Sequence, residues 1–326
     1  VRTRQVTVMR TICGVDVCKS WLDAFVAGSH RRFANSQEGC QTLAAFCCEH
    51  GVELVVMEAS GGLEQRAFVM LWKLGQPCAL ANARSVRRFA EAMGMLEKTD
   101  RIDAEMIARF AEAKRMTPTA PPSADQQRLV ALATRLRQVT QEMGNEKRRL
   151  FSTSDETARQ SVVAAIAFFK AQADHLADEI AAMIKADPLW SALDDTIRSV
   201  KGAAGRTVAY LLAELPEIGT LPNRAITKLV GLAPLPDDSG ERKGKRSIRG
   251  GRANIRSLLV LIADLVRKFD PSLADFRQRL IDKGLSKMEV RVALARKLLV
   301  RLNAKARDTR ACLLYTSDAA DEARSV

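Results

Sequence analysis

A short polar segment with three prolines, residues 117–122, divides the chain into two parts with different hydrophobic patterns. Before it, short runs rich in β-branched residues alternate with amphipathic stretches, which is typical of a mixed α/β domain. After it, apolar residues recur at three- and four-residue spacing over long stretches, as they do in packed helices. The sequence therefore predicts an α/β domain followed by a mainly helical region.

The first part contains five runs with strand character and four with helix character. The predicted strands cover residues 11–17, 21–27, 30–34, 52–57 and 76–80. Short turns join the first three strands, which predicts an antiparallel meander. The predicted helices cover residues 37–50 with Ser36 as the N-cap, 63–74, a basic helix that begins after Asn82, and 100–115.

Four acidic residues lie at the ends of these elements. Asp16 lies in the first strand, Glu58 follows the fourth, and Asp100 and Asp103 are three residues apart at a helix start. Side chains three residues apart share one helix face, and in open α/β sheets sites form at the carboxyl ends of strands. Carboxylates that converge repel one another unless a cation lies between them, and Mg²⁺ prefers oxygen ligands.

Taken together with the strand order, these four acids match the layout of an RNase H-like nuclease domain, which binds divalent metal for phosphoryl transfer. Each acid alone is a weak signal, and three of them have a simpler explanation. Asp16 could cap a turn at the strand end, and the pair Asp100 and Asp103 could form a solvated helix face.

The formal net charge of +13 favours a polyanionic partner, most often nucleic acid. Aromatic residues make up only 5% of the chain, too few for base stacking to be the main mode of binding. No run approaches the roughly 18 apolar residues of a membrane helix. The seven cysteines and three histidines lack zinc-site spacing, and the odd cysteine count predicts reduced thiols in a cytosolic protein. Residues 1–10 lack the apolar core of a signal peptide.

The second part begins with two long helical patterns, over residues from about 129 to 143 and over 156–185. A turn near residues 151–155 predicts an antiparallel helical hairpin. Its narrow apolar stripe favours a coiled coil that spaces the domains and mediates oligomerisation. An ordinary packed helix pair within one subunit explains the same stripe.

Two later segments are suited to phosphate binding. Residues 197–206 lead through a glycine-containing turn into a helix over 207–215, which is similar to a helix-hairpin-helix element. A short helix over 223–230 precedes Ser239, which stands before a glycine-containing basic run. That run leads into an apolar helix over 253–269, so it forms a loop at a helix N-terminus. Its cations are Arg242, Lys243, Lys245, Arg246, Arg249, Arg252 and Arg256.

The chain ends in a basic amphipathic helix over residues 287–307 and a tail over 311–326. The tail has no apolar period, and we interpret it as disordered or as a read-through artefact.

Four blocks together resemble a known family. They are Gly14-Val15-Asp16, Glu58-Ala59-Ser60-Gly61, the block from Lys98 to Ala104 (KTDRIDA), and Leu229 to Pro234 (LVGLAP) followed by Asp238-Ser239-Gly240. In this order and spacing they resemble the DEDD-motif transposases of bacterial insertion sequences, relatives of the Piv-type site-specific DNA invertases. The resemblance covers residues 10–308.

The resemblance implies a RuvC-like, RNase H-like domain over residues 1–116. It further implies a linker and coiled-coil hairpin over 117–187 and a mainly α-helical C-terminal transposase domain over 188–310. Asp16, Glu58, Asp100 and Asp103 would be a catalytic tetrad that holds Mg²⁺. Ser239 matches the family's nucleophile, which forms a phosphoserine–DNA intermediate, and Ser247 in the same loop is the second candidate.

The family acts on donor and target DNA as a multimer, guided by a structured RNA encoded by the element. We therefore expect a bacterial cytoplasmic, nucleoid-associated homo-oligomer, a dimer or a tetramer, that binds DNA and RNA. The expected nucleic-acid contacts are Arg84, Arg87, Arg88 and Lys98 in the first part, together with the seven cations of the basic run.

The sequence departs from the family at two places: the turn over residues 201–205 lacks the common proline and isoleucine, and Ala83 stands where proline is common. Two rival functions remain open. A Holliday-junction resolvase-like nuclease would use the tetrad without serine chemistry, and a non-catalytic nucleic-acid-binding protein would use neither. The four retained acids argue against the second rival.

Overall fold

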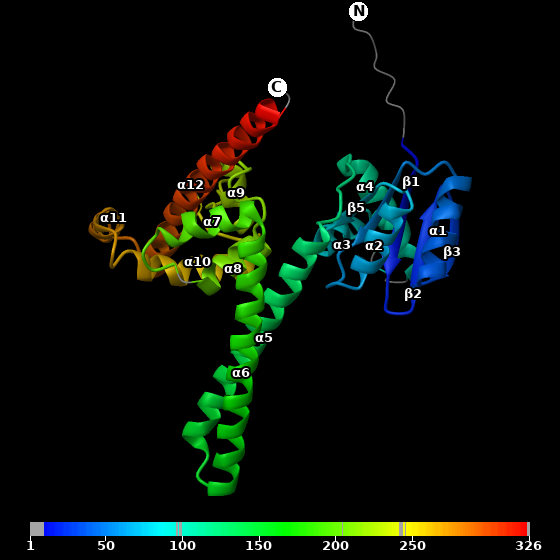
Figure 1. Cartoon of the computed structure of the whole chain (residues 1–326). Helices are drawn as coiled ribbons and strands as arrows, with labels where there is room; N and C mark the ends of the chain where they lie inside the picture. Colours follow the sequence, from blue (N-terminus) through cyan, green and yellow to red (C-terminus); the bar gives the residue numbers. More distant parts are fainter. Residues whose placement is uncertain are drawn as a thin grey trace, which may run out of the picture. The chain divides into compact units, whose positions relative to one another are not determined.

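The computed structural model describes residues 10–95, 97, 100–203, 205–240, 244 and 246–324. The chain divides into two compact units, Val1–Ser123 and Ala124–Val326. The first unit contains a mixed sheet with helices, and in the second the described residues form helices and loops (Figure 1). The expected order of an α/β part followed by a helical part is confirmed.

The first unit is built on a five-stranded sheet with the order β3-β2-β1-β4-β5. The three strands β1 (Ile12–Val17), β2 (Trp21–Val26) and β3 (Ser29–Ala34) form the antiparallel meander that the sequence predicts. The remaining strands β4 (Leu54–Glu58) and β5 (Cys78–Ala81) extend the sheet in parallel from β1. The three parallel strands therefore have their carboxyl ends at one edge of the sheet.

Helices cover both faces of this sheet because the strands bury apolar residues on both sides. On one face, Val55 and Met57 pack with α1 (Gln37–Glu49) and α2 (Glu64–Lys73). On the other face, Leu54 and Val56 pack with α3 (Ala83–Ala92) and α4 (Asp100–Lys114). The alternation along β4 assigns every second residue of a strand to the same face.

Gly14 lets the backbone of α4 approach β1 directly. A Cβ atom at this position would lie 2.2 Å from the carbonyl oxygen of Ala104 and 2.6 Å from the amide nitrogen of Ala108. Any larger residue would push α4 away from the sheet. Gly14 therefore fixes how close the first turns of α4 lie to the middle of β1.

The two outer strands of the sheet differ. The strand β3 carries the exposed Arg31 and Arg32, and the Arg32 guanidinium pairs with Asp23 on β2 at 2.8 and 3.0 Å. The strand β5 is four residues long, and the amide of Thr119 donates to the Cys78 carbonyl at 2.9 Å. One outer strand is thus charged, and the other is short and covered at its start.

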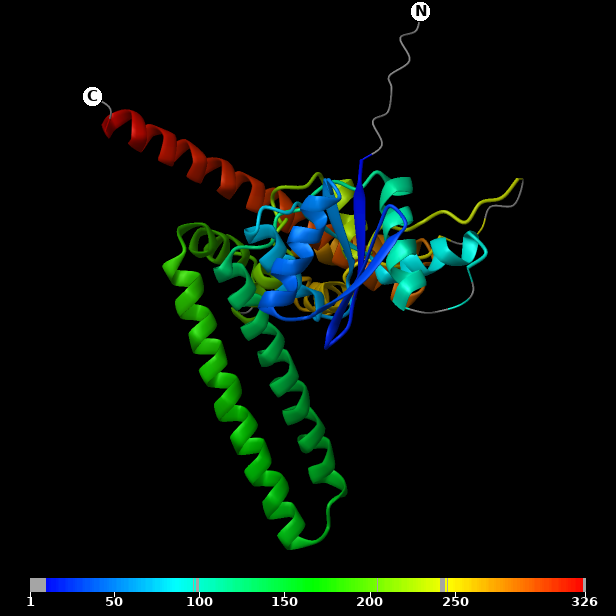
Figure 2. The ribbon, with the colours of Figure 1, turned by 90° about the vertical axis from the view of Figure 1, so that its right-hand side faces the viewer.

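The second unit begins with a long antiparallel hairpin of α5 (Ala124–Ser152) and α6 (Glu156–Ala186), which projects from the remaining helices (Figure 2). Its buried residues lie in the half nearest those helices, from Leu129 to Val139 on α5 and from Ala173 to Ile184 on α6. The Gln126 amide anchors this end by donating to the carbonyls of Leu212 and Ala213 at 3.1 and 3.0 Å.

Six further helices share a single apolar core with the base of the hairpin. They are α7 (Pro188–Arg198), α8 (Gly205–Glu214), α9 (Asn223–Val230), α10 (Ala253–Val266), α11 (Pro271–Asp282) and α12 (Lys287–Arg324). The buried Asn303 ties α12 to the segment between α8 and α9: its side chain accepts from the Gly219 amide at 2.9 Å and donates to the Leu221 carbonyl at 3.0 Å.

Three elements differ from the sequence-based expectation. The sequence analysis assigns no residue range to the helix α7 before the glycine-containing turn and does not predict α11. Each of these helices begins with a proline preceded by an aspartate N-cap. The expectation of a disordered tail is wrong for residues 311–324, which continue α12. This stretch contains no glycine or proline and is rich in alanine, so nothing in it interrupts a helix.

Candidate active site

Asp16 and Glu58 occupy the same register on neighbouring parallel strands. Val15 of β1 pairs with Met57 of β4, so the next residue on each strand brings Asp16 level with Glu58. Adjacent strands lie about 4.8 Å apart. Both acids therefore stand side by side at the carboxyl ends of β1 and β4, where the sequence placed them.

Both acids also lie on the face of the sheet that α4 covers. Gly14 contacts the α4 backbone, and Asp16, two residues later on the same strand, lies on the same face. Val56 packs against α3 and α4, and Glu58, two residues later on β4, lies on the same face. Both side chains are half-buried, and the Val17 amide donates to Asp16 Oδ1 at 3.0 Å.

The helix α4 brings Asp103 onto this same face. Asp103 is half-buried and precedes by one residue Ala104, whose carbonyl lies over Gly14. The buried Ile107 lies four residues later, so Asp103 and Ile107 lie on the same side of the helix, the side that packs on the sheet. Helix position 100 is one further turn back on that side, and the side chain of Asp100 lies outside the described residues.

The direction of α4 places its first turn near the carboxyl ends of β1 and β4, where Asp16 and Glu58 lie. After the helix, the Thr119 amide reaches the Cys78 carbonyl at the start of β5, so α4 runs toward the amino ends of the parallel strands. Its beginning therefore lies toward their carboxyl ends. A helix N-terminus carries partial positive charge, which stabilises nearby carboxylates and favours phosphate.

An additional carboxylate, which no sequence motif indicates, stands next to Asp16. Asp23 on β2 is the cross-strand partner of Asp16, and directly opposed side chains lie on the same face. The bidentate pair with Arg32 neutralises Asp23. Arg32 thereby keeps a further uncompensated negative charge away from Asp16.

Glu64 fixes the loop that follows Glu58. Its carboxylate is 4% exposed and accepts from the Gly62 amide at 2.9 Å, and from the Ser60 amide and hydroxyl at 3.1 and 3.2 Å. Burial alone would raise the pKa of Glu64, but these hydrogen bonds and its own amide outweigh it and lower the pKa below the ordinary value. No sequence motif signals this role, because the partners are mostly backbone amides.

We expect Glu64→Gln to lower the free energy of unfolding of the first unit by about 1–3 kcal/mol at neutral pH, because the amides lose a charged acceptor. The folded pKa is depressed, so this stability is present above the unfolded pKa of about 4.3 and is lost as the pH falls through the folded pKa. Urea unfolding at several pH values measures the gap between wild type and variant, which should shrink under acid conditions.

Glu49→Gln is the matched control, since Glu49 is exposed at the end of α1 in the same unit. It should leave stability nearly unchanged. A gap for Glu64→Gln that is constant across the acid range would contradict the assigned role of the carboxylate charge.

The donor set of the tetrad consists only of carboxylates, which suits a hard cation such as Mg²⁺. Asp16, Glu58 and Asp103 lie on one face at one edge of the sheet. Among the described side chains, no three acidic, histidine or cysteine groups lie close enough to hold an ion. Cation binding by these three residues and Asp100, whose side chain lies outside the described part, therefore stays a prediction.

Ser239 is exposed in the long loop between α9 and α10. Below it, Leu235 and Ser247 pair through their backbones at 2.9 and 3.4 Å, and the Gly244 amide donates to Asp238 at 3.2 Å. The backbone pair closes the base of the loop, and Ser239 lies between the two paired residues, away from that base. Ser247 lies in the paired base.

The end of this loop is fastened to the helical core. Gly231 and Gly251 meet so closely that a Cβ at Gly251 would lie 2.4 Å from the Gly231 amide nitrogen. Nη1 and Nη2 of Arg252 donate to the Glu217 carboxylate at 2.6 and 2.5 Å, and Nη1 also donates to the Glu214 carbonyl. Burial would raise the pKa of Glu217, but the Arg252 guanidinium lowers it below the ordinary value.

The other candidate nucleic-acid contacts fall into three groups. Arg84 and Arg88 on α3 and Arg246 and Arg249 in the loop are exposed. Arg87 pairs with Glu91 at 3.1 Å, and Arg256 donates to the Gly250 carbonyl at 2.5 Å, so both have local roles. The remaining candidates lie outside the described residues: Lys98, Arg242, Lys243 and Lys245.

The predicted helix-hairpin-helix-like element corresponds to α7, a glycine-containing turn and α8. Gly202 has a φ of +103°, and a Cβ there would lie 3.3 Å from the backbone of Val266 on α10. The turn is thus packed against the end of α10. Its capacity to bind phosphate stays a prediction.

Comparisons with known proteins match both units. A family model described as "Transposase" matches residues 13–158, and a model described as "Transposase IS116/IS110/IS902 family" matches residues 194–278. Pilin gene-inverting proteins of Moraxella bovis and Moraxella lacunata are each 25% identical over 314 residues, covering 89% of this chain and 94% of the relative. No helix in the described part of the chain has the length and apolarity to cross a membrane.

Proposed function

Because the chain belongs to the IS116/IS110/IS902 family of transposases, we propose that it cuts and exchanges DNA strands by a Mg²⁺-binding acidic tetrad and a serine nucleophile. DNA transposase or recombinase activity itself follows from the family. The observation that carries the proposal is the shared register and face of Asp16 and Glu58, with Asp103 above them on α4.

The first half of the proposed site is the tetrad Asp16, Glu58, Asp100 and Asp103. Its carboxylates hold the cation, which supplies charge neutralisation at a scissile phosphate. The strand order and strand directions support an RNase H-like, RuvC-like assignment of residues 1–116. Glu64 and Gly14 hold the two backbone segments on which the tetrad depends.

The second half of the proposed site is Ser239. Its hydroxyl oxygen attacks the phosphorus and a serine–phosphate ester forms. The bond from phosphorus to the deoxyribose oxygen breaks, and that leaving oxygen receives the proton that the serine hydroxyl gives up. The reverse step, with a different strand end, completes the exchange. The exposure of Ser239 and of the neighbouring Arg246 and Arg249 supports this role, since cations stabilise the charge that develops on phosphate.

We propose further that residues 117–187 form a linker and coiled-coil connector, and that residues 188–310 form the C-terminal transposase domain. The outer half of the hairpin exposes Phe151 at 94%, Phe168 at 59% and Val163 at 51%, which supports pairing with another copy of the chain. The net charge of +13 supports an element-encoded guide RNA as well as DNA. The 25% identity to pilin gene-inverting proteins supports recombination between two DNA sites.

The test is strand exchange on a plasmid that carries the gene with its flanking DNA, together with RNA transcribed from those flanks. We expect new DNA junctions with Mg²⁺ and none with EDTA, read by sequencing across the product. Nicking without any protein–DNA adduct would favour the resolvase-like nuclease. Binding without metal-dependent cleavage would favour the non-catalytic alternative, and either result would overturn the proposal.

A further inference from the structure

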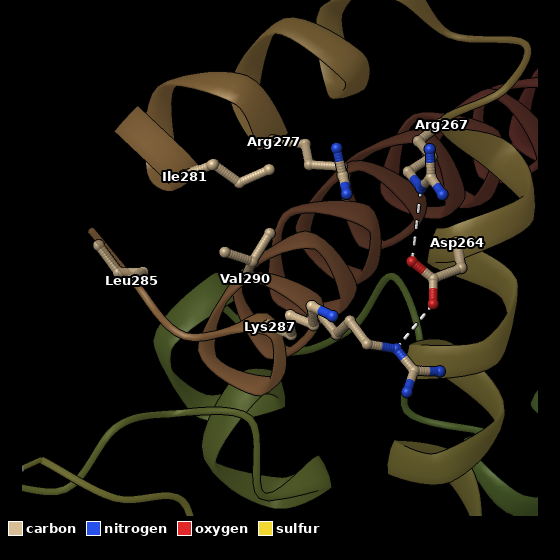
Figure 3. Close-up of a pocket in the computed structure, with 8 residues that line it drawn as sticks. Asp264, Arg267, Arg277, Ile281, Leu285, Lys287 and Val290 are labelled. Atoms are coloured by element: carbon tan, nitrogen blue, oxygen red, sulfur yellow. Dashed lines mark hydrogen bonds and ion pairs between the residues drawn. The ribbon is translucent and has the colours of Figure 1, made fainter. Parts of the chain in front are cut away.

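A cavity of about 440 Å³ lies in the second unit, and its lining residues do not include any from the loop that carries Ser239. The end of α10, the middle of α11 and the first turns of α12 surround it (Figure 3). Part of its wall is apolar and comes from Ile281, Leu285 and Val290. All five of its other lining residues are charged.

Four cations and a single acid line this cavity, which leaves an excess of three positive charges. Asp264 on α10 accepts from Arg291 at 2.7 Å and from Arg267 at 3.5 Å. A dashed line in Figure 3 marks the contact between Asp264 and Arg267. The one acid of the cavity is therefore already shared by two of the cations.

The other two cations are Arg277 on α11 and Lys287 on α12. Within the described part of the chain, neither forms an ion pair. Arg277 is half-buried, and Lys287 is the first residue of its helix, where the helix dipole disfavours a cation. Like charges gathered around a cavity destabilise the folded state unless an anion neutralises them.

The helix start beside the cavity has a fixed geometry. Ser286 and Glu289 cap α12 reciprocally, with the Ser286 amide donating to the Glu289 carboxylate at 2.9 Å and the Glu289 amide donating to Ser286 Oγ at 3.4 Å. Lys287 lies between these two residues, so its backbone is held in place. The cations on α11 and α12 are thus presented by rigid elements rather than by a loop.

We propose that this cavity binds one phosphodiester of an unpaired nucleic-acid strand, with the adjoining sugar and base edge against the apolar wall. Arg277 and Lys287 would hold the phosphate oxygens. A duplex keeps its bases stacked inside, whereas an unpaired nucleotide can bury its apolar surface against Ile281, Leu285 and Val290. The inference rests on the proposed function only in that the chain acts on nucleic acid.

The test compares two double variants of the full chain by fluorescence anisotropy across a range of salt concentrations. Arg277→Gln with Lys287→Gln removes the two cavity cations. Lys268→Gln with Lys283→Gln removes two exposed cations from the same region that do not line the cavity. Both pairs change the net charge equally. The probes are a labelled single-stranded DNA of about 20 nucleotides, the RNA of the same sequence, and the DNA duplex.

We expect the cavity pair to weaken single-strand binding about tenfold near physiological salt, and to flatten the salt dependence by about 0.7 in log–log slope for each lost contact. The control pair should change affinity about twofold at most, and duplex binding should change less than single-strand binding. The probe with the larger loss, DNA or RNA, identifies the natural strand. Thermal unfolding of both variants checks the fold, and the cavity pair should melt no lower than wild type.

Equal losses for the two pairs would overturn the inference, because diffuse surface charge would then explain binding. Unchanged binding by the cavity pair would overturn it as well. Strand exchange by the wild type reports separately on the proposed function. If junctions form while the cavity pair binds normally, only the cavity inference fails; if no junctions form while the cavity pair loses single-strand affinity selectively, only the proposed function fails.

Discussion

Glu58→Gln should lower the rate of metal-dependent strand exchange by roughly 1000-fold or more, because the metal site loses one of its charged oxygen ligands. The substitution keeps the shape of the side chain and removes its charge. Since Glu58 lies at the end of β4, beyond its buried residues, the fold should be unaffected. Junction formation measures the rate, and anisotropy should show nucleic-acid affinity within about twofold of wild type.

The matched control is Glu53→Gln. Glu53 is exposed just before β4, at the opposite end of the same strand, and its substitution makes the same change of charge. It should exchange strands at the wild-type rate. Full activity in Glu58→Gln, or equal losses in both variants, would remove Glu58 from the metal-binding tetrad.

Ser239→Ala should eliminate the covalent protein–DNA adduct and with it all strand exchange. No other group replaces the attacking oxygen, so we expect loss to the detection limit rather than a partial decrease. Trapping on a nicked DNA substrate, followed by denaturing electrophoresis, measures the adduct directly. Ser239 is exposed, so the variant should fold and bind DNA as wild type does.

Two further serine substitutions sharpen this test. Ser247→Ala removes the second candidate, which lies in the paired base of the same loop. Ser257→Ala removes an exposed hydroxyl on α10 near the end of the loop. We expect both to form the adduct. An adduct in Ser239→Ala that disappears in Ser247→Ala would transfer the nucleophile to Ser247.

Strands and most helices were predictable because their signals are local. Ser36 and Asn82 cap their helices as the sequence indicates, accepting from the amides of Gly39 and Ser85 at 3.1 Å. The starts of α7 and α11 are hard to recognise in the sequence because proline usually interrupts a helix. Proline at the first position of a helix is favourable, however. In both helices the preceding aspartate caps the N-terminus: Asp187 accepts from the Trp190 amide, and Asp270 accepts from the Leu273 amide.

Less of the candidate site was predictable. The strand ends indicated that Asp16 and Glu58 would be neighbours, because parallel strands end at one edge of a sheet. The roles of Glu64 and Asp23 depend on partners that only the folded chain brings together: two amides of a turn for Glu64, and Arg32 across the strand for Asp23. A sequence pattern contains no trace of such pairings.

The charged outer strand β3 has a consequence for the protein at high concentration. An open sheet edge is a template on which another chain can add a strand, the usual beginning of aggregation. Arg32 is paired with Asp23, but Arg31 adds an exposed positive charge to this strand, and like charges on two copies oppose such pairing. At the other edge, β5 is too short to give a long template. Both outer strands of the sheet therefore disfavour pairing with the sheet of another copy.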